Sequence, residues 1–171
     1  MIQTDITPDK TALAEIPVHF ASLAAQSSGF KAQLGKRISN PEDLVMVPAL
    51  YKLFPGITPT KWHLRIAFVV PFLKHSNTDK TPALGTFIGI LDRQTSHLEK
   101  RVLQFARAGI TDHSDMIYLR RLLIYLKEPT VNWNAPGFGS LFSINEEKNE
   151  FGKKLFVEQY FIARENTGKG E

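Results

Sequence analysis

Apolar side chains recur every three or four residues through most of this sequence, and turn-forming residues interrupt the pattern repeatedly. This spacing places the apolar side chains on one face of an α-helix, whereas a half-buried strand would alternate at every second residue. No alternating stretch and no internal repeat stands out. The pattern therefore predicts an all-α fold, a compact helical bundle of about seven to nine helices.

Proline, glycine and small polar residues set the limits of the predicted helices. The clearest start is Ser39-Asn40-Pro41-Glu42-Asp43, which combines a cap, a proline for the first turn and two carboxylates beside the positive helix end. Ser114 or Asp115 is expected to cap a later helix. The predicted helices span approximately residues 11–25, 30–34, 41–54, 60–74, 84–91, 96–108, 115–127 and 147–164, and residues 75–82 have loop composition.

A chain of 171 residues is long enough for one domain with a real core, or for two small helical lobes packed together. We expect a single domain over residues 1–171, with an N-terminal lobe of about 11–95, a C-terminal lobe of about 96–165 and a frayed tail at 166–171. Trp62 and Trp133 have apolar neighbours, which favours core positions over base stacking.

The absence of cysteine excludes disulfides and thiolate metal sites and fits a reducing compartment such as the cytoplasm. The first ten residues carry two aspartates and no basic-then-apolar signal pattern, so secretion is not expected. The longest apolar stretch, Ile66 to Leu73, contains Pro71 and is far shorter than the ~20 residues of a membrane span. No membrane contact is expected.

Catalytic and metal-binding patterns are also missing. The five histidines lack a metal-ligand spacing, and Gly85 to Gly89 lacks the spacing and lysine of a phosphate-binding loop. Asp112, His113 and Asp115 admit an acid-base cluster, but capping and turn roles explain them better. The sequence predicts no catalytic residue, no metal and no cofactor.

Basic residues are the most informative polar feature. The net charge is +4 and the pI is about 9.3, which favours an anionic partner. Basic groups beside the predicted core faces are Lys36-Arg37, Lys100-Arg101, Arg107 and Arg120-Arg121. Guanidinium groups suit phosphate, but solvated helix faces with weak surface ion pairs carry the same residues, so both interpretations stay open. In the last helix, Phe151, Leu155, Tyr160 and Phe161 are predicted inward and Lys148, Lys153 and Lys154 outward.

Three segments resemble a known family. They are LGKRISNPEDLVMVPALYKLFP from Leu34 to Pro55, GTFIGILDRQTSHLEKRVLQFARA from Gly85 to Ala108, and DMIYLRRLLIYLKEPTVNWNAPGFGSLFS from Asp115 to Ser143. In order and spacing they are similar to the small subunit of type I-E CRISPR Cascade complexes, the CasB family. The similarity covers roughly residues 20–165; Phe20 stands where that family often has tryptophan, and FSINEEK replaces a tryptophan-containing segment.

This resemblance implies an all-helical, non-enzymatic subunit that stabilises the R-loop of guide RNA and target DNA in antiviral defence. Two copies would pack head to tail beside the backbone subunits, the large subunit and the guide RNA (crRNA). By position, Arg37, Arg101, Arg107, Arg120 and Arg121 would hold the opened DNA, with Lys36 in a place where the family often has arginine. The predicted nucleic-acid-binding set also includes Lys148, Lys153 and Lys154.

Two rival functions remain. In the first, a helical scaffold uses its basic faces for protein contacts alone. In the second, which is disfavoured because no carboxylate cluster or histidine pair has metal spacing, the chain is a helical nuclease.

Overall fold

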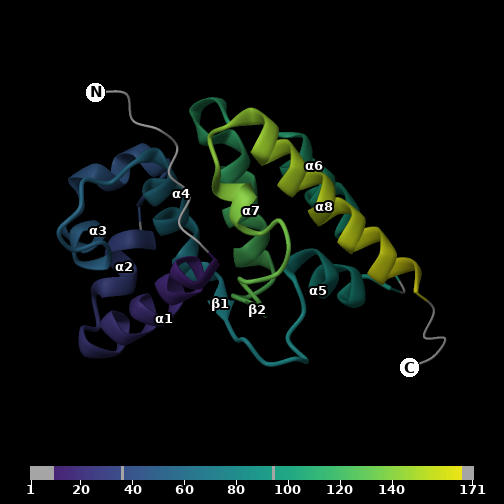
Figure 1. Cartoon of the computed structure of the whole chain (residues 1–171), viewed down its shortest axis with the longest axis horizontal. Coiled ribbons are helices and arrows are strands. Elements are labelled where there is room, and N and C mark those ends of the chain that lie inside the picture. The colour runs from purple at the N-terminus through teal and green to yellow at the C-terminus, as the bar shows by residue number, and fades with distance from the viewer. Residues whose placement is uncertain (1–9, 36, 94, 167–171) are drawn as a thin grey trace.

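The structure, a computed structural model, describes residues 10–35, 37–93 and 95–166 and confirms the predicted all-α class (Figure 1). The α-helices are α1 (Lys10–Gln26), α2 (Phe30–Gly35), α3 (Pro48–Leu53), α4 (Lys61–Val69), α5 (Leu84–Leu91), α6 (Glu99–Arg107), α7 (Ser114–Tyr125) and α8 (Glu146–Glu165). Short 3-10 helices cover Pro41–Met46, Val70–Phe72, Thr111–His113 and Gly139–Phe142. The strands β1 (Lys74–His75) and β2 (Thr130–Val131) pair in parallel.

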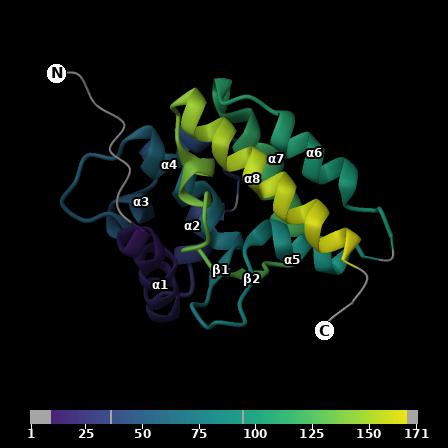
Figure 2. The same cartoon turned by 45° about the vertical axis from the view of Figure 1, so that its right-hand side comes forward.

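The helices form two groups that meet at α4 and α7. Figure 1 places α1, α2 and α3 at one end and α5, α6 and α8 at the other, with α4 and α7 between them. In the turned view, α8 runs between α5 and α6 (Figure 2). The predicted lobe boundary near residue 95 stays a prediction, but α5, which precedes it, packs along α8.

Two prolines divide helices that the sequence predicted to be continuous. The expected helix 41–54 is a 3-10 helix followed by α3, because Pro48 disfavours a helical conformation at Val47, which is extended. The expected helix 60–74 leaves α geometry after Val69, since Pro71 has no backbone N–H to donate. The helix start predicted within Ser39–Asp43, with Ser39 or Asn40 as its cap, is confirmed with Asn40 at the cap: its side chain accepts from the Glu42 N–H, and Asp43 completes the capping box.

The prediction that Ser114 or Asp115 caps α7 is wrong. The residue at the cap position is His113, and both Asp112 and His113 adopt left-handed backbone angles, with φ of 54° and 56°. This tight turn lets the chain reverse after α6 and directs the Asp115 side chain into the protein interior.

The core contains both tryptophans, as predicted: Trp62 and Trp133 are buried. The register predicted for α8 is partly wrong, since Phe151 is 59% exposed whereas Lys153 is buried. The buried face instead carries Asn149, Gly152 and Lys153 before Phe156 and Tyr160. Gly152 permits this close packing, because a Cβ there would lie 2.9 Å from the Gly137 carbonyl oxygen.

Candidate nucleic-acid interface

Helices α6 and α7 present basic side chains on one packed helix pair. Arg101 and Arg107 are exposed on α6, and Arg121 is exposed on α7. The Arg101 guanidinium lies 4.2 Å from the centroid of the Tyr125 ring, and that of Arg121 lies 5.9 Å from the centroid of Tyr118. We call this surface the α6–α7 basic face; its residues are Lys100, Arg101, Arg107, Tyr118, Arg121 and Tyr125.

No ion pair among the described residues neutralises the cations of the α6–α7 basic face. The four cations that form no ion pair with any described residue are Lys100, Arg101, Arg107 and Arg121. The two tyrosines were not singled out from the sequence, although Tyr118 and Tyr125 stand three and four residues from Arg121, the spacing of neighbours on a helix face. Together these groups offer charge for phosphates and aromatic faces that orient the guanidinium groups.

Arg120 does not lie on this surface, which corrects its predicted exposure. Only 7% exposed, it stacks between Phe68 and Phe72, with its guanidinium 4.2 Å and 4.8 Å from their ring centroids. Its Nη2 donates to the Gly35 carbonyl, and burial lowers the pKa of Arg120 to about 10. Arg120 therefore fastens the end of α2 to α7.

The residues after Gly35 include two predicted site residues. Arg37 is exposed in the segment between α2 and the first 3-10 helix and has a left-handed φ of 67°. Lys36 lies outside the described residues. Since Arg120 holds Gly35 and precedes Arg121 in the chain, Arg37 belongs to a segment fastened beside α7.

Lys153 was predicted to face outward and is 5% exposed. Its Nζ donates to the Ala108 carbonyl at 2.7 Å and lies 3.0 Å from a carboxylate oxygen of Asp115. Burial lowers the pKa of Lys153, an effect that Asp115 partly offsets. The lysine joins α8 to the end of α6.

Asp115 is the centre of a buried ionic cluster that sequence reasoning missed. Arg65, fully buried on α4, donates from two nitrogens to the two Asp115 oxygens at 2.9 Å and 2.6 Å. Its remaining N–H groups go to the carbonyls of Leu141 and Phe142 and to His113 Nδ1. All five donors of the guanidinium are thus used, which is what a buried arginine requires.

The contact with Arg65 determines which ring nitrogen of His113 carries the proton. A guanidinium can only donate, so Nδ1 of His113 accepts, and Nε2 carries the proton that is donated to Glu42 at 2.5 Å. His113 and Asp115 therefore belong to a structural network that links four segments of the chain. The Asp112 side chain is exposed and lies outside this network, and the Asp112 backbone carbonyl accepts a hydrogen bond from Asn40.

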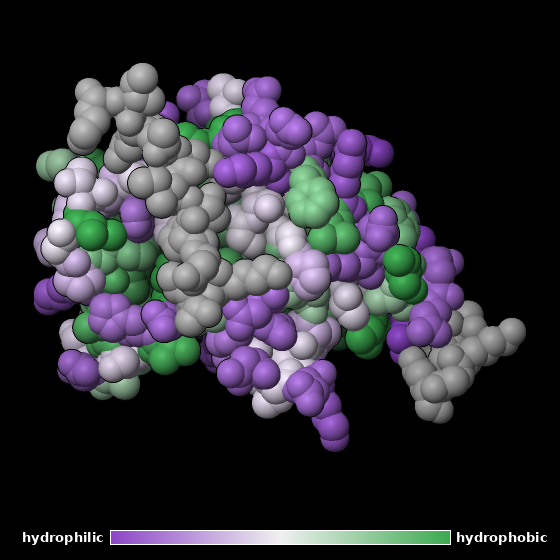
Figure 3. All heavy atoms as spheres, in the orientation of Figure 1, coloured by the Kyte–Doolittle hydropathy of each residue, from purple (hydrophilic) through white to green (hydrophobic). Residues whose placement is uncertain are grey.

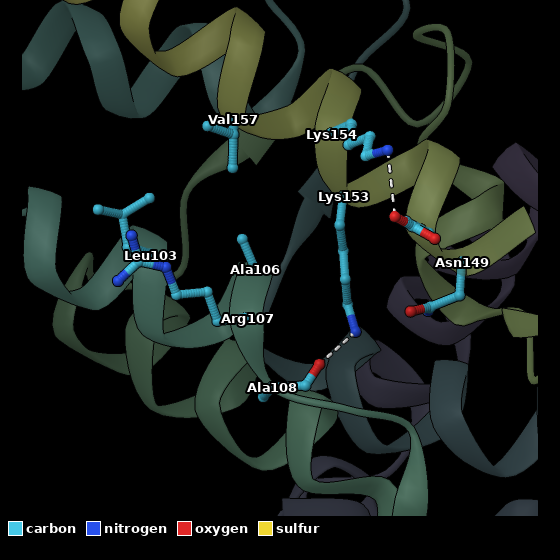
Figure 4. Close-up of a pocket in the computed structure, with 9 residues that line it drawn as sticks. Leu103, Ala106, Arg107, Ala108, Asn149, Lys153, Lys154 and Val157 are labelled. Atoms are coloured by element: carbon cyan, nitrogen blue, oxygen red, sulfur yellow. Dashed lines mark hydrogen bonds and ion pairs between the residues drawn. The ribbon is translucent and has the colours of Figure 1, made fainter. Parts of the chain in front are cut away.

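The last two predicted residues lie on exposed turns of α8. Lys148 is exposed in its first turn, and Lys154 pairs with Glu150 at 3.1 Å. Lys154 and Lys153 share a pocket of about 420 Å³ with Arg107 between α6 and α8 (Figure 4). The structure thus joins Arg107 to both lysines. The contacts described do not connect Lys148 to them.

Within residues 10–35, 37–93 and 95–166, no group of three or more histidine, aspartate or glutamate side chains is placed to hold a metal ion. No helix in the described part of the chain is long and apolar enough to cross a membrane.

Comparisons with known proteins bear on both sequence and fold. No protein-family model matches the sequence. The chain is 29% identical over 119 residues to the CRISPR system Cascade subunit CasB of Escherichia coli strain K12, covering 62% of this chain and 70% of that protein. The fold is similar to that of one chain in a crystal structure of E. coli Cascade bound to a PAM-containing double-stranded DNA target. In this match the TM-score is 0.65 and the identity 24%, and it covers 91% of this chain and 97% of the other.

Proposed function

We propose that this chain, which is CasB-like in sequence and in fold, is the small subunit of a type I-E CRISPR Cascade complex and holds the backbone of the opened target DNA. The observation that carries the proposal is the α6–α7 basic face, whose four cations have no ion-pair partner among the described residues. We assign the subunit a non-catalytic role in the prokaryotic cytoplasm.

A basic face of this kind is sufficient to hold opened target DNA, because the subunit does not need to read the DNA sequence. In an RNA-guided complex, base pairing with the guide reads the sequence, and the exchange of a DNA duplex for an RNA–DNA duplex is nearly balanced in free energy. A few phosphate contacts on the displaced or opened strand then decide whether the opened state persists. The Tyr125 ring beside Arg101 and the Tyr118 ring beside Arg121 restrict these two guanidinium groups before binding, which reduces the side-chain entropy they lose on contact with phosphate.

The predicted site residues divide into two roles under this proposal. The first role, contact with phosphates, belongs to the exposed cations Arg37, Arg101, Arg107, Arg121, Lys148 and Lys154. Lys36 is assigned to the same role on sequence alone. Arg120 and Lys153 act from inside the protein. Arg120 fastens the segment that carries Arg37, and Lys153 fastens α8 to α6.

The test uses the assembled complex with Arg101→Ala and Arg121→Ala combined in this subunit. We expect weaker target-DNA binding and a flatter dependence of the affinity on salt, because each phosphate that is no longer neutralised lowers the logarithmic slope by roughly 0.7 to 0.9. The matched control is Lys52→Ala, which removes an exposed charge from α3 at the other end of the molecule. Unchanged affinity and slope in a fully assembled complex would contradict the proposal.

A second function, a scaffold whose surfaces contact only protein subunits, is favoured by exposed apolar residues on α8. Phe151 and Ile162 are both more than half exposed, and Figure 3 shows apolar side chains among the polar surface along this helix. Co-expression with the other subunits and a guide RNA separates the two functions. If the arginine variants fail to co-purify in stoichiometric amount, the scaffold function is supported; if they assemble normally and lose DNA, the first proposal is supported.

A further inference from the structure

We propose that the pocket between α6 and α8 binds one unpaired nucleotide of DNA, with the base inside the pocket and its phosphate at Arg107. This inference rests on the proposed function and adds to it a site for a base on a surface otherwise assigned to the backbone.

The walls of the pocket suit a flat, partly apolar group. Leu103 and Ala106 from α6 face Val157 from α8 across the opening (Figure 4). The volume of about 420 Å³ lies within the roughly 300 to 1,000 Å³ typical of small-molecule sites. Aliphatic walls can pack against the faces of a base whatever its identity.

The charges around the pocket favour the binding of an anion. Three cations line it, Arg107, Lys153 and Lys154, against the single carboxylate of Glu150. Glu150 is paired with Lys154 at the exposed surface, and Arg107 is the exposed cation of the pocket that has no ion-pair partner among the described residues. Behind the wall, the buried Arg65 neutralises Asp115, so the positive charge of Lys153 is not cancelled by that carboxylate alone.

The pocket also contains a polar group able to meet a base edge. The Asn149 side chain is buried at the wall, and its Nδ2 donates to the Leu141 carbonyl at 3.1 Å. Its Oδ1 accepts no hydrogen bond from the described residues, so it remains available to an N–H of a base. An acceptor, apolar walls and a cationic rim together match a nucleotide better than a bare phosphate.

The pocket continues into the α6–α7 basic face. A second hollow of about 650 Å³ lies on the other side of Arg107 and is lined by Lys100, Gln104 and Tyr118. Both hollows share Leu103, Arg107 and Ala108. A strand that follows the basic face therefore reaches Arg107 at the point where a base can turn into the α6–α8 pocket.

The test is an NMR titration of the full chain, which detects weak binding. The probes are hexathymidylate and a hexamer of the same charge that lacks bases. We expect hexathymidylate to shift the methyl signals of Leu103, Ala106 and Val157 in a saturable way, and the abasic hexamer to shift the Arg107 guanidinium signal but not those methyls. The inference is overturned if both hexamers shift the methyls equally or if neither shifts them.

A pocket-filling variant gives an independent readout. Ala106→Leu adds bulk without changing charge, and Ala25→Leu makes the same change at an exposed position of α1. Ala106→Leu should remove the advantage of hexathymidylate over the abasic hexamer and keep the salt dependence, whereas Ala25→Leu should keep both. If the variant instead prevents assembly with the other subunits and leaves oligonucleotide binding intact, the pocket holds a protein segment and the inference fails. Retained salt-dependent DNA binding by the assembled complex would still support the proposed function.

Discussion

Arg120 and Arg121 are neighbours in the sequence with different environments in the structure. The α7 helix turns Arg121 to solvent and Arg120 between two phenylalanine rings. The sequence marks both as basic residues beside a core stripe, and helical periodicity alone does not separate them because each adjoins Leu119 or Leu122. What separates them is the aromatic pair Phe68 and Phe72, which a distant part of the chain supplies.

Arg120→Ala should lower the free energy of unfolding by about 2 to 4 kcal/mol, because it removes a hydrogen bond from a charged donor and the stacking on two rings. Arg121→Ala, the adjacent control, should change it by less than about 0.5 kcal/mol. Urea unfolding followed by circular dichroism measures both. Equal losses in the two variants would show that Arg120 has no special structural role.

The binding role of Arg120 is tested by a double-mutant cycle with Arg37. If Arg120 acts by fastening the Arg37 segment, the two alanine substitutions together should weaken target-DNA binding by the assembled complex no more than the larger single effect. Additive losses would mean that Arg120 meets the DNA itself.

Lys153 gives a prediction about pH. Burial puts its folded-state pKa below the ordinary value of 10.5. At a pH between the folded-state and the unfolded-state pKa, the unfolded chain binds more protons than the folded chain does. The contribution of Lys153 to the free energy of unfolding therefore rises as the pH increases through this range. Lys153→Met should abolish this rise and lower the free energy of unfolding at pH 7 by about 1 to 3 kcal/mol, because the Ala108 carbonyl loses its hydrogen bond while Asp115 keeps Arg65 as a partner. Urea unfolding from pH 7 to pH 10.5 measures it, and an unchanged pH profile in the variant would refute it.

At the residue scale, prediction succeeded where a property belongs to one side chain and its helix. The exposure of Arg107 follows from helical periodicity, and the burial of the two tryptophans follows from their apolar neighbours in the sequence. It failed for Lys153 and Asp115, because a buried charge is recognisable only when its partner is known, and Arg65 lies far away in the sequence. The same holds for the pocket, whose two walls come from different helices.

At the scale of elements, two glycines explain why α5 packs closely on α8. A Cβ on Gly85 would overlap the Phe156 carbonyl oxygen, and one on Gly89 would overlap that of Tyr160. The sequence around these glycines has no phosphate-binding pattern. Their four-residue spacing leaves one face of α5 free of side chains, and the α8 backbone occupies that space.

Gly89→Ala should therefore be destabilising by about 1 to 3 kcal/mol, because the added methyl group forces the two helices apart. Gly29→Ala is the matched control, since no atom lies within 4 Å of a Cβ there, and it should be neutral or stabilising by up to about 1 kcal/mol. Thermal unfolding compares the two. A Gly89→Ala protein as stable as the control would exclude the close contact.

Helix limits were predicted well where a cap or a glycine marks them and poorly where proline competes with a long apolar pattern. Asn40 is an example of the first kind, and Pro48 and Pro71 are examples of the second. The parallel pair of β1 and β2 had no signal, because two residues per strand are too few to show alternation.

At the scale of the whole molecule, the Arg65–Asp115 pair joins the two groups of helices. Asp115→Asn should lower the free energy of unfolding by about 3 to 5 kcal/mol, since it leaves the buried Arg65 charge without its counter-ion. Asp112→Asn changes an exposed aspartate nearby and should have an effect below about 0.5 kcal/mol. Urea unfolding measures both variants, and a small effect of Asp115→Asn would mean that the cluster contributes little.

All the hydrogen bonds that the Arg65 guanidinium donates depend on parts of the chain that are synthesised later than Arg65 itself. Every group that accepts a hydrogen bond from its guanidinium comes from residues 113 to 142, which leave the ribosome long after α4. Until then the charge must stay hydrated, because burying it alone is too costly. Burial of Arg65 can therefore be completed only after α7 and the segment that follows it have emerged.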